Sequence, residues 1–64
     1  MLTLNFDADD GRKFKIELNV DYLCAHTRET FEFWSAPNRL PDFVQLSDVL
    51  DGLTWAIDKR NAMR

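Results

Sequence analysis

The sequence predicts an α+β fold, in which a three-stranded antiparallel β-meander packs one face against a single C-terminal α-helix in the order β-β-β-α. Two periodicities lead to this prediction. In the first half of the chain, apolar residues recur at every second position, and in the last third they recur at spacings of three and four. The first spacing is typical of strands with one buried face and the second of an amphipathic helix. The 64 residues are enough for one domain, 1–64, which at this size buries only about 60% of the surface of the unfolded chain.

The first strand is expected at Leu2 to Phe6, where apolar residues alternate with Thr3 and Asn5. The Asp-rich segment 7–11 is typical of a hairpin turn, because Asp caps tight turns and Gly11 adopts positive φ at little steric cost. A second strand is expected after the turn, where every second residue is apolar: Phe14, Ile16, Leu18, Val20, Tyr22 and Cys24.

The end of the second strand is open to two interpretations. The strand can continue to Cys24, or a short helical turn capped by Asp21 can run to His26. A third strand is expected next, because Phe31 and Phe33 alternate with polar residues.

Pro37 and Pro41 end the sheet, since proline lacks the backbone donor that a strand needs. The segment 35–41 is therefore expected to be a crossover loop that leads to the helix. The helix would cover the sheet face that holds the apolar residues Phe6, Phe14, Ile16, Leu18, Val20, Phe31 and Phe33. The opposite sheet face would be solvated, apart from Trp34.

The helix is expected from about Phe43 to Arg60, opened by a capping box of Asp42 and Gln45. Alternatively, 43–46 forms a short fourth strand and the helix starts at a Ser47 cap. At about 100° per residue, one helix face holds the apolar residues Phe43, Leu46, Val49, Leu50, Leu53, Ala56 and Ile57.

Trp55 lies nearly opposite this apolar face, on a stripe with Val44, Asp48, Asp51 and Asp58. An aromatic anchor within a polar rim is typical of a protein-binding hot spot, and carboxylates at the rim favour a basic protein partner. Homodimerisation is a second form of the same hypothesis. The alternative is structural, with the 37–41 loop folded over the indole. Gly52, one turn before Trp55, weakens the helix by about 1 kcal/mol relative to Ala, which is understandable if another group packs closely there.

The formal net charge of -3 weighs against a sequence-independent nucleic-acid binder, which needs positive surface to displace counterions. A nucleic-acid-associated regulator is kept as the alternative function. It would use Trp34 as a stacking residue on the sheet face, or the basic tail of Lys59, Arg60 and Arg64.

No catalytic, metal or cofactor site is indicated. The run Asp7, Asp9, Asp10 before Gly11 is one residue short of a calcium loop. Cys24 and His26 would share a strand face, but zinc needs a second ligand pair that the chain lacks. A single cysteine, and an N-terminus without a basic or apolar leader region, predict a cytoplasmic protein with no membrane span. We therefore expect a small, acidic, non-catalytic protein-interaction module that acts as an inhibitor, adaptor or accessory subunit.

Overall fold

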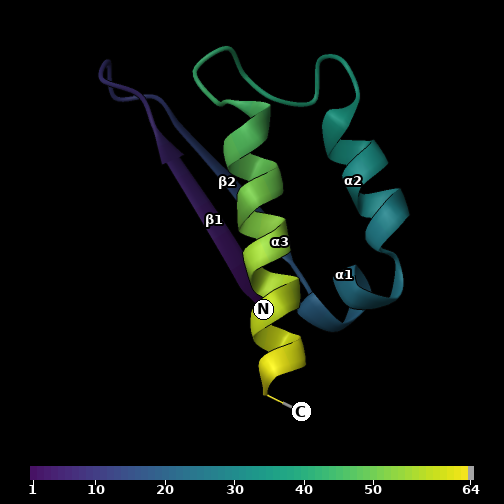
Figure 1. The fold of residues 1–64 in the computed structure, drawn as a ribbon. Helices are drawn as coiled ribbons and strands as arrows, with labels where there is room; N and C mark the ends of the chain where they lie inside the picture. Colours follow the sequence, from purple (N-terminus) through teal and green to yellow (C-terminus); the bar gives the residue numbers. More distant parts are fainter. Residues whose placement is uncertain (64) are drawn as a thin grey trace.

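Residues 1–63, which the computed structural model describes, form a two-stranded antiparallel hairpin followed by three helices (Figure 1). The elements are β1 (Leu2–Asp7), β2 (Lys13–Leu18), α1 (Val20–Ala25), α2 (Thr27–Ser35) and α3 (Leu46–Ala62). The predicted α+β class is confirmed, whereas the three-stranded meander with one C-terminal helix is wrong. None of the helices within residues 1–63 is long and apolar enough to cross a membrane.

The hairpin agrees with the prediction. Strands β1 and β2 pair in a register that runs from Leu2↔Leu18 to Asp7↔Lys13. In the turn, the Ala8 amide donates to the Arg12 carbonyl over 2.8 Å, and Gly11 has the expected positive φ of 93°. Both strands therefore turn their alternate apolar side chains to the same face of the sheet.

The second strand ends at Leu18, so the predicted continuation to Cys24 is wrong. Asn19 caps α1 instead: its side-chain oxygen accepts from the amides of Asp21 at 2.8 Å and Tyr22 at 3.2 Å. The helical-turn alternative was closer, although it assigned the cap to Asp21. Within α1, Val20, Leu23 and Cys24 are partly or fully buried, whereas the intervening Asp21 and Tyr22 are both exposed. Burial at spacings of three and four is typical of a helix and not of a strand.

The predicted third strand is helix α2. Thr30, Phe31 and Trp34 turn toward the core at helical spacing, while Phe33, predicted as a core residue, is 47% exposed. The hydroxyl of Thr30 donates to the carbonyl four residues earlier over 2.9 Å. An ion pair one turn apart, between Arg28 and Glu32 at 3.0 Å, also supports the helix.

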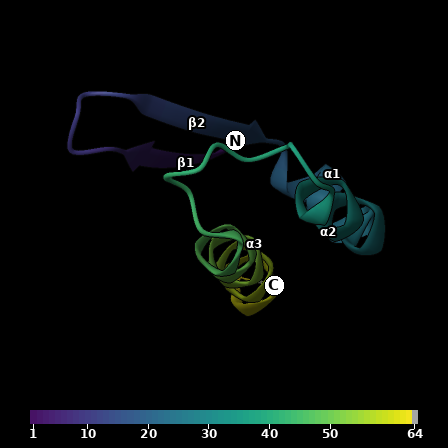
Figure 2. The same cartoon turned by 90° about the horizontal axis from the view of Figure 1, so that it is seen from above.

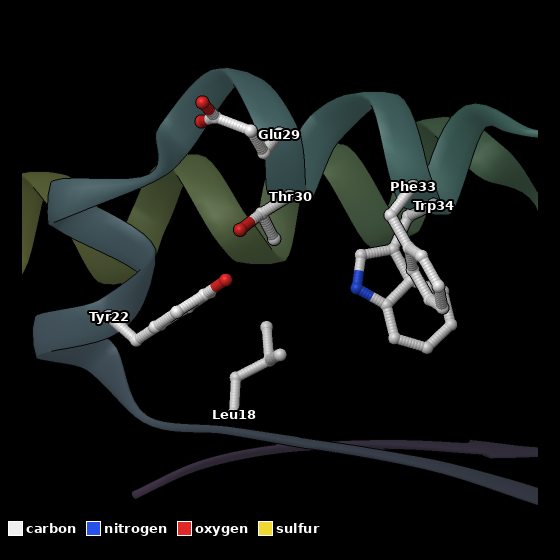
Figure 3. A pocket seen from close by; sticks show the side chains of 6 residues that line it. All are labelled: Leu18, Tyr22, Glu29, Thr30, Phe33 and Trp34. Atoms are coloured by element: carbon white, nitrogen blue, oxygen red, sulfur yellow. The ribbon is translucent and has the colours of Figure 1, made fainter.

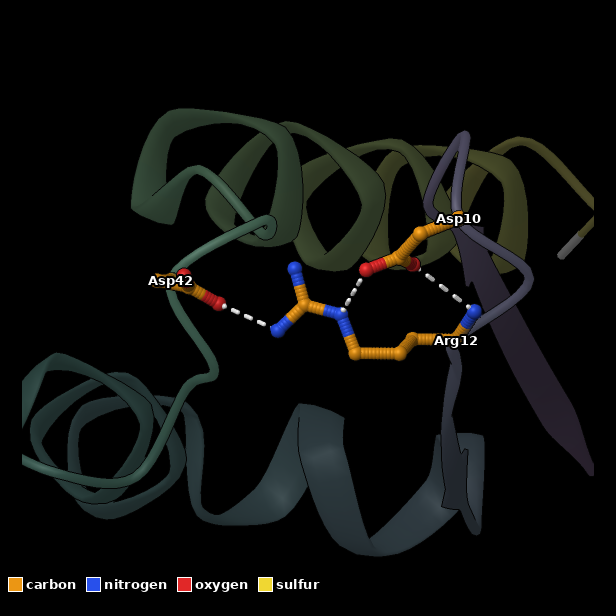
Figure 4. A network of polar contacts seen from close by, with 3 residues as sticks. All are labelled: Asp10, Arg12 and Asp42. Atoms are coloured by element: carbon orange, nitrogen blue, oxygen red, sulfur yellow. Dashed lines mark hydrogen bonds and ion pairs between the residues drawn. The ribbon is translucent and has the colours of Figure 1, made fainter.

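Helix α3 begins at Leu46 after Gln45, and no side-chain hydrogen bond caps it. Both predicted starts are therefore wrong, because residues 43–45 are neither helix nor strand and the helix already includes Leu46 and Ser47. Asp42 has a different role: its carboxylate lies 3.0 Å from Arg12, which also binds Asp10 at 2.7 Å (Figure 4). The Arg12 guanidinium thus links the hairpin turn to the segment before α3.

The core lies between the hairpin, α3 and the pair of helices α1 and α2, which surround it from three sides (Figure 2). Its fully buried side chains come from β2, α1 and α3: Ile16, Leu23, Val49 and Leu53. The other face of the hairpin is exposed and polar, with Thr3, Asn5, Lys13, Lys15 and Glu17. Trp34 is not on that face, contrary to the prediction.

Candidate protein-binding surface

Trp55 projects from the side of α3 that does not pack in the core. The indole is 57% exposed, whereas Val49, Leu53 and Ala56 of the same helix are buried. The predicted position of Trp55 outside the apolar face is confirmed. The loop-cover alternative is wrong, because the Trp55 side chain is 57% exposed, and the groove beside it is lined by residues outside 37–41.

An apolar groove of about 280 Å³ lies beside Trp55. Its lining comes from the start of β1, from α1 and from the last turns of α3: Met1, Leu2, Val20, Trp55, Ala56, Lys59, Arg60 and Met63. Met1 and Met63 are 86% and 80% exposed at its rim. Methionine adapts its shape easily to a partner, so this rim can fit side chains of several forms.

Two cations border the groove. The Lys59 ammonium lies 4.7 Å from the centroid of the Trp55 ring, in cation–π geometry. The Arg60 Nη2 atom binds the Asp21 carboxylate over 2.8 Å, which ties α1 to α3, and Arg60 Nη1 is buried without an acceptor among the described residues. Lys59 and Arg60 were predicted only as part of a nucleic-acid-binding tail and not as part of the Trp55 surface, although Lys59 is one helical turn from Trp55 and could have been placed there from that spacing.

The other residues predicted for this surface divide between exposed positions and the core. Asp48, Asp51 and Asp58 are exposed on α3, and within residues 1–63 none of the three carboxylates forms an ion pair. The prediction that Val44 lies on the same exposed stripe is wrong. Val44 precedes α3 and is buried in the core, and its amide donates to the Pro41 carbonyl. We define the Trp55 surface as Trp55, the three aspartates and the groove.

Trp34 does not belong to this surface. Its ring packs edge-on against the rings of Phe14 and Phe33, with centroid distances of 6.4 Å and 5.0 Å. It lines a second groove of about 310 Å³, together with Leu18, Tyr22, Glu29, Thr30 and Phe33. The Tyr22 hydroxyl and the indole nitrogen both point into this second groove (Figure 3).

The basis of the nucleic-acid alternative is weakened by these positions. Trp34 lies on a helix and is half-buried, so the exposed sheet face carries no stacking residue. Lys15 on that face binds Glu17 at 2.8 Å; this hydrogen bond and the opposite charges lower the pKa of Glu17 and raise the pKa of Lys15. In the basic tail, Lys59 and Arg60 have the contacts described above, and Arg64 lies outside the described residues.

Among residues 1–63, no group of three or more His, Cys, Asp or Glu side chains is placed to share a metal ion. Cys24 lies half-buried on α1 and not on a strand, and His26 stacks on Tyr22 with ring centroids 4.2 Å apart. The predicted common strand face of Cys24 and His26 is therefore wrong.

Comparisons of the chain with family models, with curated proteins and with solved structures give no significant match. A function must therefore be inferred from the chemistry of the chain's own surface.

Proposed function

We propose that this chain is a small, non-catalytic protein-interaction module that binds another protein chain through the Trp55 surface. The observation that carries the proposal is the exposure of Trp55, at 57%, on a helix whose core face is complete without it. An inhibitor, an adaptor or an accessory subunit acts in this way.

An exposed tryptophan beside an apolar groove is well suited to binding. Tryptophan offers a large, rigid contact area and is enriched at hot spots, where a few residues provide most of the binding energy. The groove extends this area, since Met1 and Met63 line it together with Trp55. The exposed aspartates and Lys59 form a polar rim, which favours encounter with a partner of complementary charge.

The composition of the groove supports binding and not catalysis. Its described lining contains two cations, Lys59 and Arg60, but no carboxylate, histidine or thiol. Carboxylates, histidines and thiols are the commonest general acid–base and nucleophilic groups, whereas a lysine usually serves in these roles when burial or a neighbouring cation activates it. Lys59 is exposed and lies against the Trp55 ring. A cytoplasmic location belongs to the proposal as well, since Cys24 has no second cysteine in the chain with which to form a disulfide.

The test compares Trp55→Ala with Tyr22→Ala, which removes an equally exposed aromatic side chain from another face. A protein captured with the wild-type chain is identified and purified, and its binding to all three forms is titrated calorimetrically. Trp55→Ala should weaken binding by at least 2 kcal/mol, the size expected for a hot spot, while Tyr22→Ala should retain nearly wild-type affinity.

Two outcomes would contradict the proposal. If Trp55→Ala binds the purified partner as tightly as the wild type, the Trp55 surface is not the contact. If both variants lose binding equally, the loss is not specific to this surface.

A further inference from the structure

The groove beside Trp55 restricts the chemistry of its occupant. Most of its lining is apolar, so it favours an apolar side chain, and Lys59 at its border favours a carboxylate next to that side chain. A volume of about 280 Å³ leaves room for a large side chain such as an indole. The fitting ligand is therefore a protein segment with a bulky apolar residue and an acidic neighbour.

The outer side of α3 has this same chemistry. Trp55 is exposed on it, and Asp51 and Asp58 lie one turn before and after, also exposed. At about 100° per residue, both aspartates fall on one side of Trp55, while Ala56 and Lys59 of the groove fall on the other. The chain thus carries the groove and a matching occupant next to each other.

From this arrangement we infer that the partner at the Trp55 surface is a second copy of this chain, in a two-fold symmetric dimer; the inference rests on the proposed function. A two-fold interface needs a patch that is complementary to itself. Suppose that the two-fold axis is parallel to α3 and passes between the two copies of Trp55. The acidic side of each α3 then faces the groove of the other copy. Asp58 of each copy then lies opposite Lys59 of the other, and this contact forms twice.

The symmetry also explains why charges of both signs border the indole. A surface meant only for a basic partner would not need Lys59 against the Trp55 ring. In the dimer, each Lys59 forms an ion pair with Asp58 of the second copy. Each Trp55 indole is then buried in the groove of the second copy. The desolvated centre is apolar and the charges remain at the rim, which is the usual anatomy of an interface.

The test measures the monomer–dimer equilibrium by sedimentation equilibrium for the wild type, Trp55→Ala, Asp58→Lys and Lys59→Asp. The wild type should dimerise, and Trp55→Ala should weaken dimerisation by about 30-fold or more, which corresponds to a hot-spot contact. Asp58→Lys and Lys59→Asp should each dimerise more weakly than the wild type, because each places like charges opposite one another. An equimolar mixture of these two variants should form a heterodimer, since the opposite charges then face each other again. Glu32→Lys on α2, which is outside the Trp55 surface, is the control for a charge reversal and should dimerise like the wild type.

Three results would overturn the inference. A wild-type chain that remains monomeric up to about 1 mM, a concentration that would reveal even a weak dimer, excludes the second copy; if binding to a purified partner still depends on Trp55, the proposed function remains valid. A dimer that is unaffected by Trp55→Ala lies on another surface. Failure of the two charge variants to associate with each other excludes the arrangement with Asp58 opposite Lys59.

Discussion

Ile16 is the residue on which the hairpin's contribution to the core can best be measured. Its side chain is 1% exposed, and replacement by Ala removes buried methyl groups and leaves a cavity. Ile16→Ala should therefore lower the free energy of unfolding by about 2 to 5 kcal/mol. Urea denaturation gives the value, and Lys15→Ala is the matched control on the neighbouring exposed position.

Lys15→Ala should have a small effect, because Lys15 and its partner Glu17 are both exposed and such ion pairs contribute little. Equal losses for Ile16→Ala and Lys15→Ala would mean that the two faces of β2 are reversed. The sequence predicted these faces correctly, since alternation alone determines them within a regular strand.

Trp55 and Val44 show which single residues can be predicted in this way. The outward position of Trp55 depends only on its angle around the helix axis relative to Val49 and Leu53. These residues are in the same helix as Trp55 for either predicted helix start, so an error in the start does not change that angle. The predicted position of Val44 depended on where the helix begins. Because α3 begins at Leu46, three residues after the predicted start at Phe43, Val44 precedes the helix and turns into the core.

Among the elements, α1 and α2 were not predicted because their sequences also fit strands. Val20, Tyr22 and Cys24 continue the alternation of β2, and Phe31 and Phe33 form a short alternation of their own. In the folded protein both segments are helices, and each buries residues at helical spacing in the core that they share with the hairpin and α3. The deciding local signal was Asn19, a residue strongly preferred at N-caps.

Asn19→Ala tests the contribution of this cap. The substitution removes the acceptor for the amides of Asp21 and Tyr22, so the free energy of unfolding should fall by about 1 kcal/mol. Asn5→Ala, at an exposed position of β1, is the control for the same chemical change away from a helix start. If urea denaturation shows equal losses for the two variants, the side chain of Asn19 does not stabilise α1.

Gly52 shows how two elements come into close contact. A Cβ atom at this position would lie 2.9 Å from a terminal methyl group of Leu4, so the absence of a side chain lets β1 approach α3. From the sequence, close packing of another group was one explanation of the glycine at this position, and a tolerated glycine without a packing role was the other. The sequence could not identify Leu4, because that contact depends on how the hairpin and the helix are placed relative to each other.

At the scale of the whole molecule, the groove beside Trp55 is the feature that the sequence could not reveal. Met1, Val20 and Met63 come from three different parts of the chain and meet only in the folded protein. The ion pair between Asp21 and Arg60 holds α1 against α3 and thereby completes the wall of the groove. The outward position of Trp55 was predictable from one helix, but its surroundings were not.

The stability of the monomer distinguishes an anchor residue from a core residue. At protein concentrations low enough to exclude association, Trp55→Ala should change the free energy of unfolding by about 1 kcal/mol or less, the value of an exposed cation–π contact with Lys59. Leu53→Ala, at a fully buried position of the same helix, should cost about 2 to 5 kcal/mol. At higher concentration the wild type should gain thermal stability through dimer formation, and Trp55→Ala should not, since only association makes Tm depend on concentration. Thermal and urea denaturation over a range of protein concentrations measure both effects. If Trp55→Ala lowers the free energy of unfolding at high dilution as much as Leu53→Ala does, the indole stabilises the fold of the monomer itself.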